Sequence, residues 1–166
     1  MSWIVFIYKV PSTPTKYRAY IWRELKKLGA LYLQDGVCIL PNKDDVYLFI
    51  DTLSDKVNTF GGQEFTFLST TFFKEKEEQM IQQFNDARNA EYTELMRSLL
   101  EFQENFNEKE EWEFSEIQQK KIREEFQKLL RQFQIIEARD YFEADQGRKV
   151  RFLIDTCRKI LTQTQL

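Results

Sequence analysis

The sequence predicts an α+β fold, in which a ferredoxin-like βαββαβ domain over residues 1–70 is followed by a helical extension over residues 71–166. Two observations predict the first part. Short apolar runs typical of strands alternate with amphipathic helical patterns, and the dipeptide Asp35-Gly36 separates two of these runs. The third observation predicts the helical extension. After residue 62 the chain contains one glycine, Gly147, and no proline, and these two residues are the ones that most often interrupt helices.

The first strand and helix are predicted from the start of the chain. Trp3–Tyr8 is a short apolar, β-branched run typical of a buried strand. Thr13 followed by Pro14 predicts a helix start, with threonine as N-cap and proline at the first helical position. Gly29 predicts a left-handed C-cap. The apolar positions between them recur at helical spacing: Tyr17, Ile21, Leu25 and Leu28, with Trp22 beside them.

A hairpin and a second helix complete the first domain. Residues 30–34 alternate as in a strand, and Asp35-Gly36 predicts a two-residue type I′ turn. Residues 37–40 return as the partner strand, which Pro41 closes. Residues 64–68 read as a fourth strand after Gly61-Gly62. The resulting order, β-α-β-β-α-β, is typical of the split βαβ fold. The second helix is predicted from Val46, Phe49, Ile50, Leu53 and Val57.

The extension is predicted to contain two paired helices and a third. Ser115 with Gln118 forms a capping-box pattern at the start of the second arm. Asp145 is the expected N-cap of the third helix, whose apolar face includes Val150 and Cys157. We expect the two arms to form an antiparallel hairpin or part of a compact bundle. Their apolar positions are Tyr92, Leu95, Leu99, Phe102 and Phe106 in the first arm and Ile122, Phe126, Leu129, Phe133 and Ile136 in the second.

Several segments together resemble the N-terminal domain of the chromate-resistance ChrB family, which carries a helix of the form R-x-x-x-W-R-x-L-K-x-x-G-A. The resemblance extends to residues 87–92 and 138–142. It implies an intracellular role in regulating or supporting a chromate-resistance operon, and a further C-terminal domain in full-length members. The matching residues are Arg18, Trp22, Arg23, Leu25, Lys26, Gly29 and Ala30, followed by Gln34-Asp35-Gly36-Val37 and Leu40-Pro41.

The same core is similar to CRISPR spacer-acquisition proteins and to a domain of PaaX-type repressors. Nuclease-type members of the first group place an aspartate at the end of strand one. This sequence has Lys9 at that position, so a metal-dependent phosphodiesterase would lack an expected ligand. The second resemblance supports regulatory use of the scaffold by analogy.

Composition argues against catalysis. The chain has no histidine, and Cys38 and Cys157 are far apart in sequence, which argues against most zinc, copper, haem and histidine-based sites. Asp44, Asp45 and Asp51 remain magnesium candidates, although an acidic helix N-terminus that complements the macrodipole is the preferred interpretation. We therefore expect no catalytic residues, no cofactor and no metal site.

The expected location is the cytoplasm. The two cysteines are expected as buried thiols rather than as a disulfide, which suits a reducing compartment. The apolar start is too short for a signal sequence, and no apolar run approaches the roughly 20 residues of a membrane span.

The predicted first helix supplies the candidate DNA- or anion-binding residues. Lys16, Arg23 and Lys27 fall within about 40° of one another at 3.6 residues per turn. Arg18 and Lys26 add positive charge nearby. The alternative is an ordinary solvated face, because residues 1–70 balance 8 basic against 7 acidic residues and the whole chain has a net charge of −3.

Other positions carry weaker expectations. We expect Trp22 to pack in the core, whereas Trp112, in the polar connection between the arms, is a candidate for a dimer contact. The basic residues around the last helix are interpreted as solvated charge: Arg148, Lys149, Arg151, Arg158 and Lys159.

Three functional hypotheses follow. The first is a non-enzymatic regulatory or accessory protein of chromate-resistance type that binds DNA or an oxyanion through its basic first helix. The second is a structural module whose helical half binds a separate protein partner. The third is a divalent-metal nuclease using Asp35, Asp44 or Asp45. A homodimer is expected in addition, through an edge strand of the sheet or exposed phenylalanines on the helical hairpin.

Overall fold

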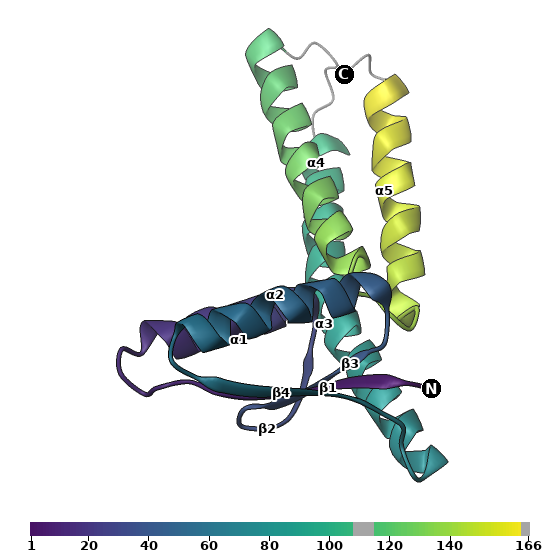
Figure 1. Ribbon diagram of the computed structural model, residues 1–166. Coiled ribbons are helices and arrows are strands. Elements are labelled where there is room, and N and C mark those ends of the chain that lie inside the picture. The colour runs from purple at the N-terminus through teal and green to yellow at the C-terminus, as the bar shows by residue number, and fades with distance from the viewer. Residues whose placement is uncertain (108–114, 164–166) are drawn as a thin grey trace. The chain divides into compact units, whose positions relative to one another are not determined.

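The computed structural model describes residues 1–107 and 115–163, which form an α+β structure with four strands and five helices (Figure 1). Trp112 lies outside the described residues, as does the side chain of Phe106, so the expectations for both stay predictions. The chain forms two compact units, Met1–Phe84 (unit 1) and Asn85–Leu166 (unit 2). Helix α3 (Lys74–Asn107) contributes to both units, and each unit is described by itself.

Unit 1 contains an antiparallel four-stranded sheet with the strand order β2-β3-β1-β4. Every strand and helix predicted for residues 1–70 is present. In chain order these are β1 (Trp3–Lys9), α1 (Lys16–Leu28), β2 (Leu31–Gln34), β3 (Val37–Pro41), α2 (Asp44–Thr59) and β4 (Gln63–Ser69).

The predicted start of α1 is wrong by about half a turn. The helix begins at Lys16 and its N-cap is Thr15, whose side chain makes no capping hydrogen bond. Pro14 lies before the helix, where its carbonyl accepts the N–H of Tyr17 at 3.2 Å. This bond satisfies a first-turn donor without the side-chain cap predicted for Thr13. The predicted C-cap is confirmed, because Gly29 has a φ of 77°.

The predicted type I′ turn is also wrong. That turn needs positive φ at both central residues. Gly36 has a φ of 72°, but Glu143 is the only non-glycine residue with positive φ in the described part of the chain, so Asp35 does not meet the requirement. The pairing of β2 with β3 is irregular between Tyr32 and Gln34. This irregularity lets the hairpin close with a single left-handed residue.

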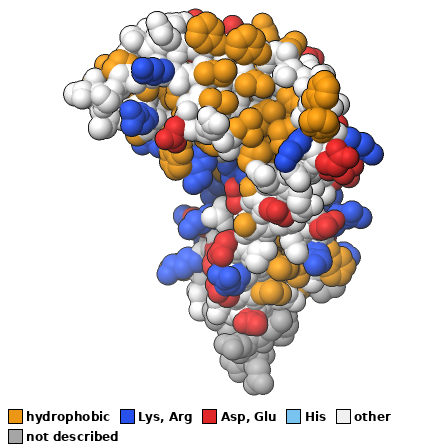
Figure 2. Space-filling view, turned by 90° about the horizontal axis from the view of Figure 1, so that it is seen from below, with side chains coloured by type: hydrophobic (Ala, Val, Ile, Leu, Met, Phe, Trp, Pro, Cys, Tyr) orange, Lys and Arg blue, Asp and Glu red, His pale blue; other side chains and the backbone are white. Residues whose placement is uncertain are grey.

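The two faces of the sheet are covered differently. Helices α1 and α2 lie on one face, as Figure 1 shows, and bury residues from β1 and β3. On the other face, the ring of Trp3 stacks on Phe84 of α3 with centroids 5.9 Å apart. Phe65 and Phe67 on that face are 60% and 51% exposed. Figure 2, seen from below, shows hydrophobic side chains gathered on this side. The core under α1 and α2 comprises Ile4, Phe6, Ile21, Leu25, Cys38, Leu40, Val46, Ile50, Leu53 and Val57.

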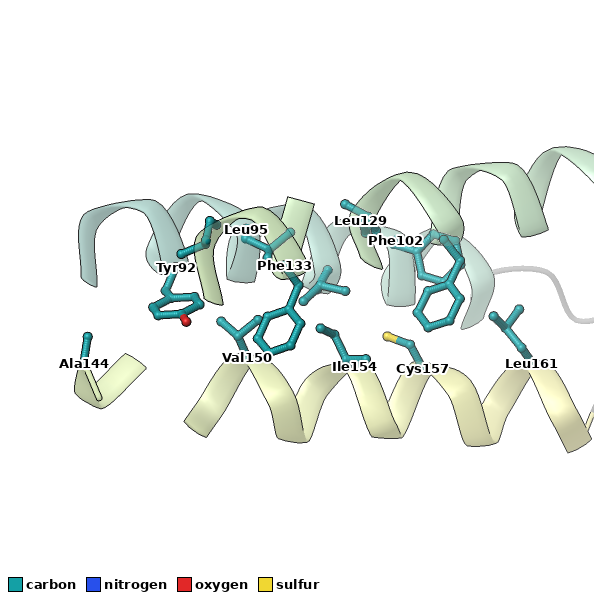
Figure 3. Packing of buried hydrophobic residues seen from close by; sticks show 13 residues of the cluster. Tyr92, Leu95, Phe102, Leu129, Phe133, Ala144, Val150, Ile154, Cys157 and Leu161 are labelled. Atoms are coloured by element: carbon teal, nitrogen blue, oxygen red, sulfur yellow. The ribbon is translucent and has the colours of Figure 1, made fainter. Parts of the chain in front are cut away.

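Unit 2 buries one core contributed by three helices: α3, α4 (Glu116–Glu137) and α5 (Asp145–Gln163) (Figure 3). The Ser115 capping box at the start of α4 is confirmed, with Gln118 as the reciprocal partner. The predicted apolar positions with described side chains supply most of the core. The cluster comprises Tyr92, Leu95, Leu99, Phe102, Phe126, Leu129, Phe133, Ile136, Ala144, Val150, Ile154, Cys157 and Leu161.

A network of charged residues joins the two unit 2 segments that carry the family resemblance. Arg88 is 6% exposed, and its Nη2 lies 3.0 Å from Oε1 of Glu91. The other oxygen of Glu91 lies 2.5 Å from Nη2 of Arg139. Burial lowers the pKa of Arg88, whereas the charge of Glu91 acts in the opposite direction. Tyr92 donates a hydrogen bond to Asp140 at 3.1 Å. The carboxylate of Glu91 therefore links α3 to Arg139, which lies two residues after the end of α4.

The expectation that Asp145 caps the last helix is wrong. Asp145 is the first residue of α5. The donors at this helix start are bonded by two side chains from outside α5, one distant in sequence and one four residues upstream. The N–H of Gln146 donates to Oδ1 of Asn89 at 2.9 Å, and that of Ala144 donates to Oδ1 of Asp140 at 3.0 Å. These two side chains satisfy backbone N–H groups that the predicted N-cap was expected to satisfy.

None of the helices in residues 1–107 and 115–163 combines the length and apolar character that crossing a membrane requires.

Candidate functional site

A groove of about 870 Å³ lies in unit 1 at the C-terminal end of β1, between α1 and the β2–β3 turn. A second hollow of about 380 Å³ adjoins it, and Lys9, Val10 and Arg18 line both. We call the two together the Arg18 groove. The larger hollow is in the size range of small-molecule sites. Its polar and aromatic lining includes Tyr8, Lys9, Arg18, Trp22, Tyr32 and Asp35.

Two glycines shape the backbone around the end of β1. The carbonyl of Gly36 accepts the N–H of Tyr8 at 2.8 Å, and a Cβ on Gly36 would lie 2.4 Å from the carbonyl oxygen of Tyr8. On the other side, a Cβ on Gly62 would lie 2.5 Å from the carbonyl oxygen of Lys9. Both contacts are too close for any side chain. The turns on either side can therefore approach the strand only because these positions are glycine.

A pair of tyrosine hydroxyls lies in the groove. The hydroxyl oxygens of Tyr8 and Tyr32 are 3.1 Å apart, and both side chains are half-buried. Burial raises the pKa of Tyr8 above the ordinary 10.0, and the charge of Arg18 acts against this shift. Burial also raises the pKa of Tyr32, and its hydrogen bond with Tyr8 adds to the effect. At neutral pH both groups are therefore neutral hydroxyls that can donate hydrogen bonds.

This tyrosine pair should make the stability of unit 1 fall at high pH. The raised pKa values mean that folded Tyr8 and Tyr32 keep protons that the unfolded chain releases above its ordinary value of 10.0. Their contribution is thus intact below that pH and is lost as the pH rises from there toward the folded pKa values. The measurement is denaturant unfolding at about pH 9 and about pH 11.

The matched control for this prediction is the double variant Tyr8→Phe with Tyr32→Phe, which has neither hydroxyl. The fluorescence of Trp3 and Trp22 follows unit 1 in a Trp112→Phe background. We expect the double variant to lose less stability between the two pH values than the parent. An equal loss in both proteins would show that other groups cause the pH dependence.

The groove has the chemistry of an anion site. Arg18 and Lys9 supply positive charge, and the exposed guanidinium of Arg18 is close enough to lower the pKa of Tyr8. Asp35 also lines the groove, and its negative charge raises the pKa of Tyr8. Charge-assisted hydrogen bonds from arginine to an oxyanion are among the stronger polar contacts in proteins. The arrangement can hold an anion against two cationic side chains and the one hydroxyl of the tyrosine pair whose hydrogen is not used between the two oxygens.

Of the five predicted binding residues, Arg18 alone lines this groove. All five are exposed side chains of α1. Lys27 forms an ion pair with Glu24 at 2.7 Å. The others are placed as follows: Nζ of Lys26 lies 4.8 Å from the ring centroid of Trp22, Nζ of Lys16 lies 5.5 Å from that of Tyr17, and Arg23 faces solvent.

The expectation that Trp22 packs in the core is wrong, because its side chain is 46% exposed. Ile21 and Leu25 occupy the buried stripe of α1. Trp22 lies about 100° around the helix from Ile21, where it lines the groove instead.

Three groove residues were not among the sequence-based candidates: Tyr8, Lys9 and Tyr32. Lys9 was noted only as a replacement for a carboxylate. The signal that identifies the tyrosines is the sheet order, because β3 connects β1 to β2 and places Tyr8 and Tyr32 on one surface. Sequence spacing alone carries no such information.

Of the acidic candidates, Asp35 lines the groove, whereas the others and the two thiols lie elsewhere. Asp44 and Asp45 are exposed in the first turn of α2, and Asp51 is exposed further along it. Among residues 1–107 and 115–163, no three or more acidic or cysteine side chains cluster in a way that would hold a metal ion. The expectation of buried free thiols is confirmed for Cys38 and Cys157. Burial raises the pKa of Cys38 to about 12 and also raises that of Cys157.

Comparison with known proteins identifies one family. The family described as "Protein ChrB, N-terminal" matches residues 18–164. "Protein ChrB" of Cupriavidus metallidurans is 26% identical over 116 residues, which cover 70% of this chain and 35% of that relative. The matched region thus spans about a third of the relative's length. No solved structure matches the chain. Because the family match extends over most of the sequence, from α1 to the last described turn of α5, this chain belongs to the ChrB N-terminal family.

Proposed function

We propose that this chain is a non-enzymatic regulatory or accessory domain of chromate-resistance type, and that it binds a small tetrahedral oxyanion in the Arg18 groove. The family match supports the broad role. The observation that carries the binding proposal is the placement of Arg18 and Lys9 on both adjoining hollows, beside the Tyr8–Tyr32 hydroxyl pair. Two buried reduced thiols support a cytoplasmic location.

We further propose that unit 1 is a ferredoxin-like domain and that α3 and α4 form an antiparallel hairpin. The first proposal is supported by the β2-β3-β1-β4 order with α1 and α2 as crossovers. The second is supported by ring contacts. Tyr92 lies 6.2 Å from Phe133, whereas Phe102, further along α3, lies 5.7 Å from Phe126, earlier in α4.

A small oxyanion fits these observations better than DNA. The Arg18 groove is concave and of small-molecule size, whereas the exposed side of α1 that carries Lys16, Arg23 and Lys27 has one of its charges paired with Glu24. The net charge of −3 is also unlike that of a strong phosphate-backbone binder.

The test is isothermal titration calorimetry of the purified chain with chromate and, as a non-oxidising tetrahedral dianion, with sulfate. We expect saturable binding that Arg18→Gln weakens about tenfold or more, which corresponds to losing one charge-assisted hydrogen bond. Lys9→Gln should weaken binding in the same direction. Because Arg18 and Lys9 are exposed, both variants should retain the parent's circular dichroism spectrum.

Arg23→Gln is the matched control, since it removes the same charge from the same helix outside the groove. We expect it to leave oxyanion affinity within about twofold. No binding of either anion, or equal weakening by both arginine variants, would contradict the proposal. Duplex DNA binding that depends on Arg23 and Lys27 but not on Arg18 would instead favour DNA contact through the exposed side of α1.

A further inference from the structure

Strand β4 forms one edge of the unit 1 sheet and lacks the features that usually block edge pairing. It pairs with β1 through a continuous register from Gln63 to Ser69, with no bulge. Its sequence contains neither proline nor lysine, and Glu64 is its only charged residue. Natural edge strands usually carry lysine, proline or a bulge to prevent association. Within the described residues, the outer side of β4 is therefore an open pairing edge.

The side chains of β4 extend an apolar surface. Phe65 and Phe67 lie opposite Ile7 and Val5 of β1, on the face of the sheet away from α1 and α2. Their rings stack with centroids 6.4 Å apart. Three positions beside them on that face are also apolar: Val37 and Ile39 in β3, and Leu31 in β2. Figure 2 shows the hydrophobic side chains gathered there. An apolar stretch of this kind suits a protein partner better than a phosphate backbone.

The sequence of β4 is self-complementary around Thr66. In an antiparallel pair centred on this residue, Phe65 of one copy lies opposite Phe67 of the other, and the reverse pair is identical. Glu64 then lies opposite Leu68, so that the two Glu64 carboxylates do not face one another. Aromatic pairs across strands are favourable, and a two-fold axis uses the same patch on both copies.

We propose that a second copy of this chain pairs with β4 in this register, so that the two sheets continue across a two-fold axis at Thr66. This dimer is independent of the proposed oxyanion site. Palindromic placement of two exposed phenylalanines around a central threonine is the feature that selects a second copy over a different protein.

The exposed apolar area of β4 is small, which favours a weak dimer over a permanent one. At 60% and 51% exposure, Phe65 and Phe67 together leave on the order of 200 Å² of ring uncovered. Leu68, which is 63% exposed, and the open backbone edge add to this area. Stable interfaces bury about 800 Å² per partner, so β4 supplies part of what a permanent dimer needs. We therefore expect association that depends on protein concentration.

The first test is sedimentation velocity of the full chain over a wide concentration series. Thr66→Lys places two like charges opposite one another at the two-fold axis and should weaken dimerisation about tenfold or more. Thr52→Lys, at an exposed position on α2, adds the same charge away from the strand and should leave dimerisation unchanged. A wild-type chain that stays monomeric at the highest concentration would overturn the proposal.

Mixing two variants tests the register. Thr66→Glu should weaken the dimer as Thr66→Lys does, but an equal mixture of the two should dimerise again because opposite charges then meet at the axis. The single substitution Thr66→Cys should also give a disulfide-linked dimer under mild oxidation, since Cys38 and Cys157 are buried. Thr52→Cys is the control. A dimer that neither Thr66 charge weakens, or a mixture that does not recover, would overturn pairing at this register.

Discussion

Replacing Glu91 with alanine should destabilise unit 2 by about 3 kcal/mol. Glu91 is the carboxylate that contacts both Arg88 and Arg139, at 3.0 Å and 2.5 Å. Arg88 is 6% exposed, and its Nη1 is already a buried donor without a hydrogen-bond partner in the structure. Without Glu91, the buried guanidinium of Arg88 would lose its carboxylate partner. The positive charge of Arg139 would still oppose it, since that charge already lowers the pKa of Arg88. Removing one member of a buried ion pair typically costs 3–5 kcal/mol, and the 30% exposure of Glu91 places this case at the lower end.

The measurement is urea unfolding followed by circular dichroism at 222 nm, because α4, α5 and most of α3 lie in unit 2. Glu94→Ala is the matched control. Glu94 forms the same i,i+3 pair on the same helix with Arg97, at the same 3.0 Å, but both side chains are more than 60% exposed. We expect the control to cost under about 1 kcal/mol.

A second variant separates the charge effect from lost packing. Replacing Arg88 with methionine and Glu91 with leucine together removes the most deeply buried charge with its partner and leaves only Arg139 without its contact to Glu91. Exchanges of a buried ion pair for apolar residues are often neutral or stabilising. The double variant should therefore be more stable than Glu91→Ala alone. If the single variant lost less than about 1 kcal/mol, the guanidinium of Arg88 would have to be stabilised without Glu91.

The elements of both units follow from local signals in the sequence. The stripe that includes Ile21 and Leu25 defines the buried face of α1, and Gly29 defines its end. The helices of unit 2 are similarly predicted by apolar positions recurring every three or four residues, because each helix must bury one face. These features depend on residues a few positions apart, which is the information that a single sequence holds.

The sequence-based predictions fail, or miss a feature, mostly where contacts between residues far apart in the chain determine the structure. In the first turn of α5, the N–H of Gln146 donates to the side chain of Asn89, 57 positions away, so Asp145 does not have to cap the helix. The network around Glu91 joins residues 48 positions apart. The Arg18 groove exists because the sheet order brings Tyr32 beside Tyr8. The turn at Asp35 was predicted from its dipeptide, but the irregular strand pairing changed its type.

Replacing Gly36 with alanine should destabilise unit 1 by about 3 kcal/mol. Part of this cost is the positive φ of 72°, which an alanine tolerates poorly. The larger part is a collision, because the new Cβ would lie 2.4 Å from the carbonyl oxygen of Tyr8. Relieving it moves the turn away from β1 and breaks the 2.8 Å hydrogen bond from Tyr8 to Gly36. The measurement is denaturant unfolding followed by the fluorescence of Trp3 and Trp22 in a Trp112→Phe background.

Gly61→Ala separates the two parts of this cost. Gly61 has a φ of 71°, almost the same as that of Gly36, but a Cβ there would meet nothing within 4 Å. It should therefore cost only about 1 kcal/mol, from the backbone conformation. Equal losses of stability in the two variants would mean that a Cβ at position 36 does not collide with the carbonyl oxygen of Tyr8. A larger loss for Gly36 should be accompanied by weaker oxyanion binding, because the same displacement separates Tyr32 from Tyr8 and opens the Arg18 groove.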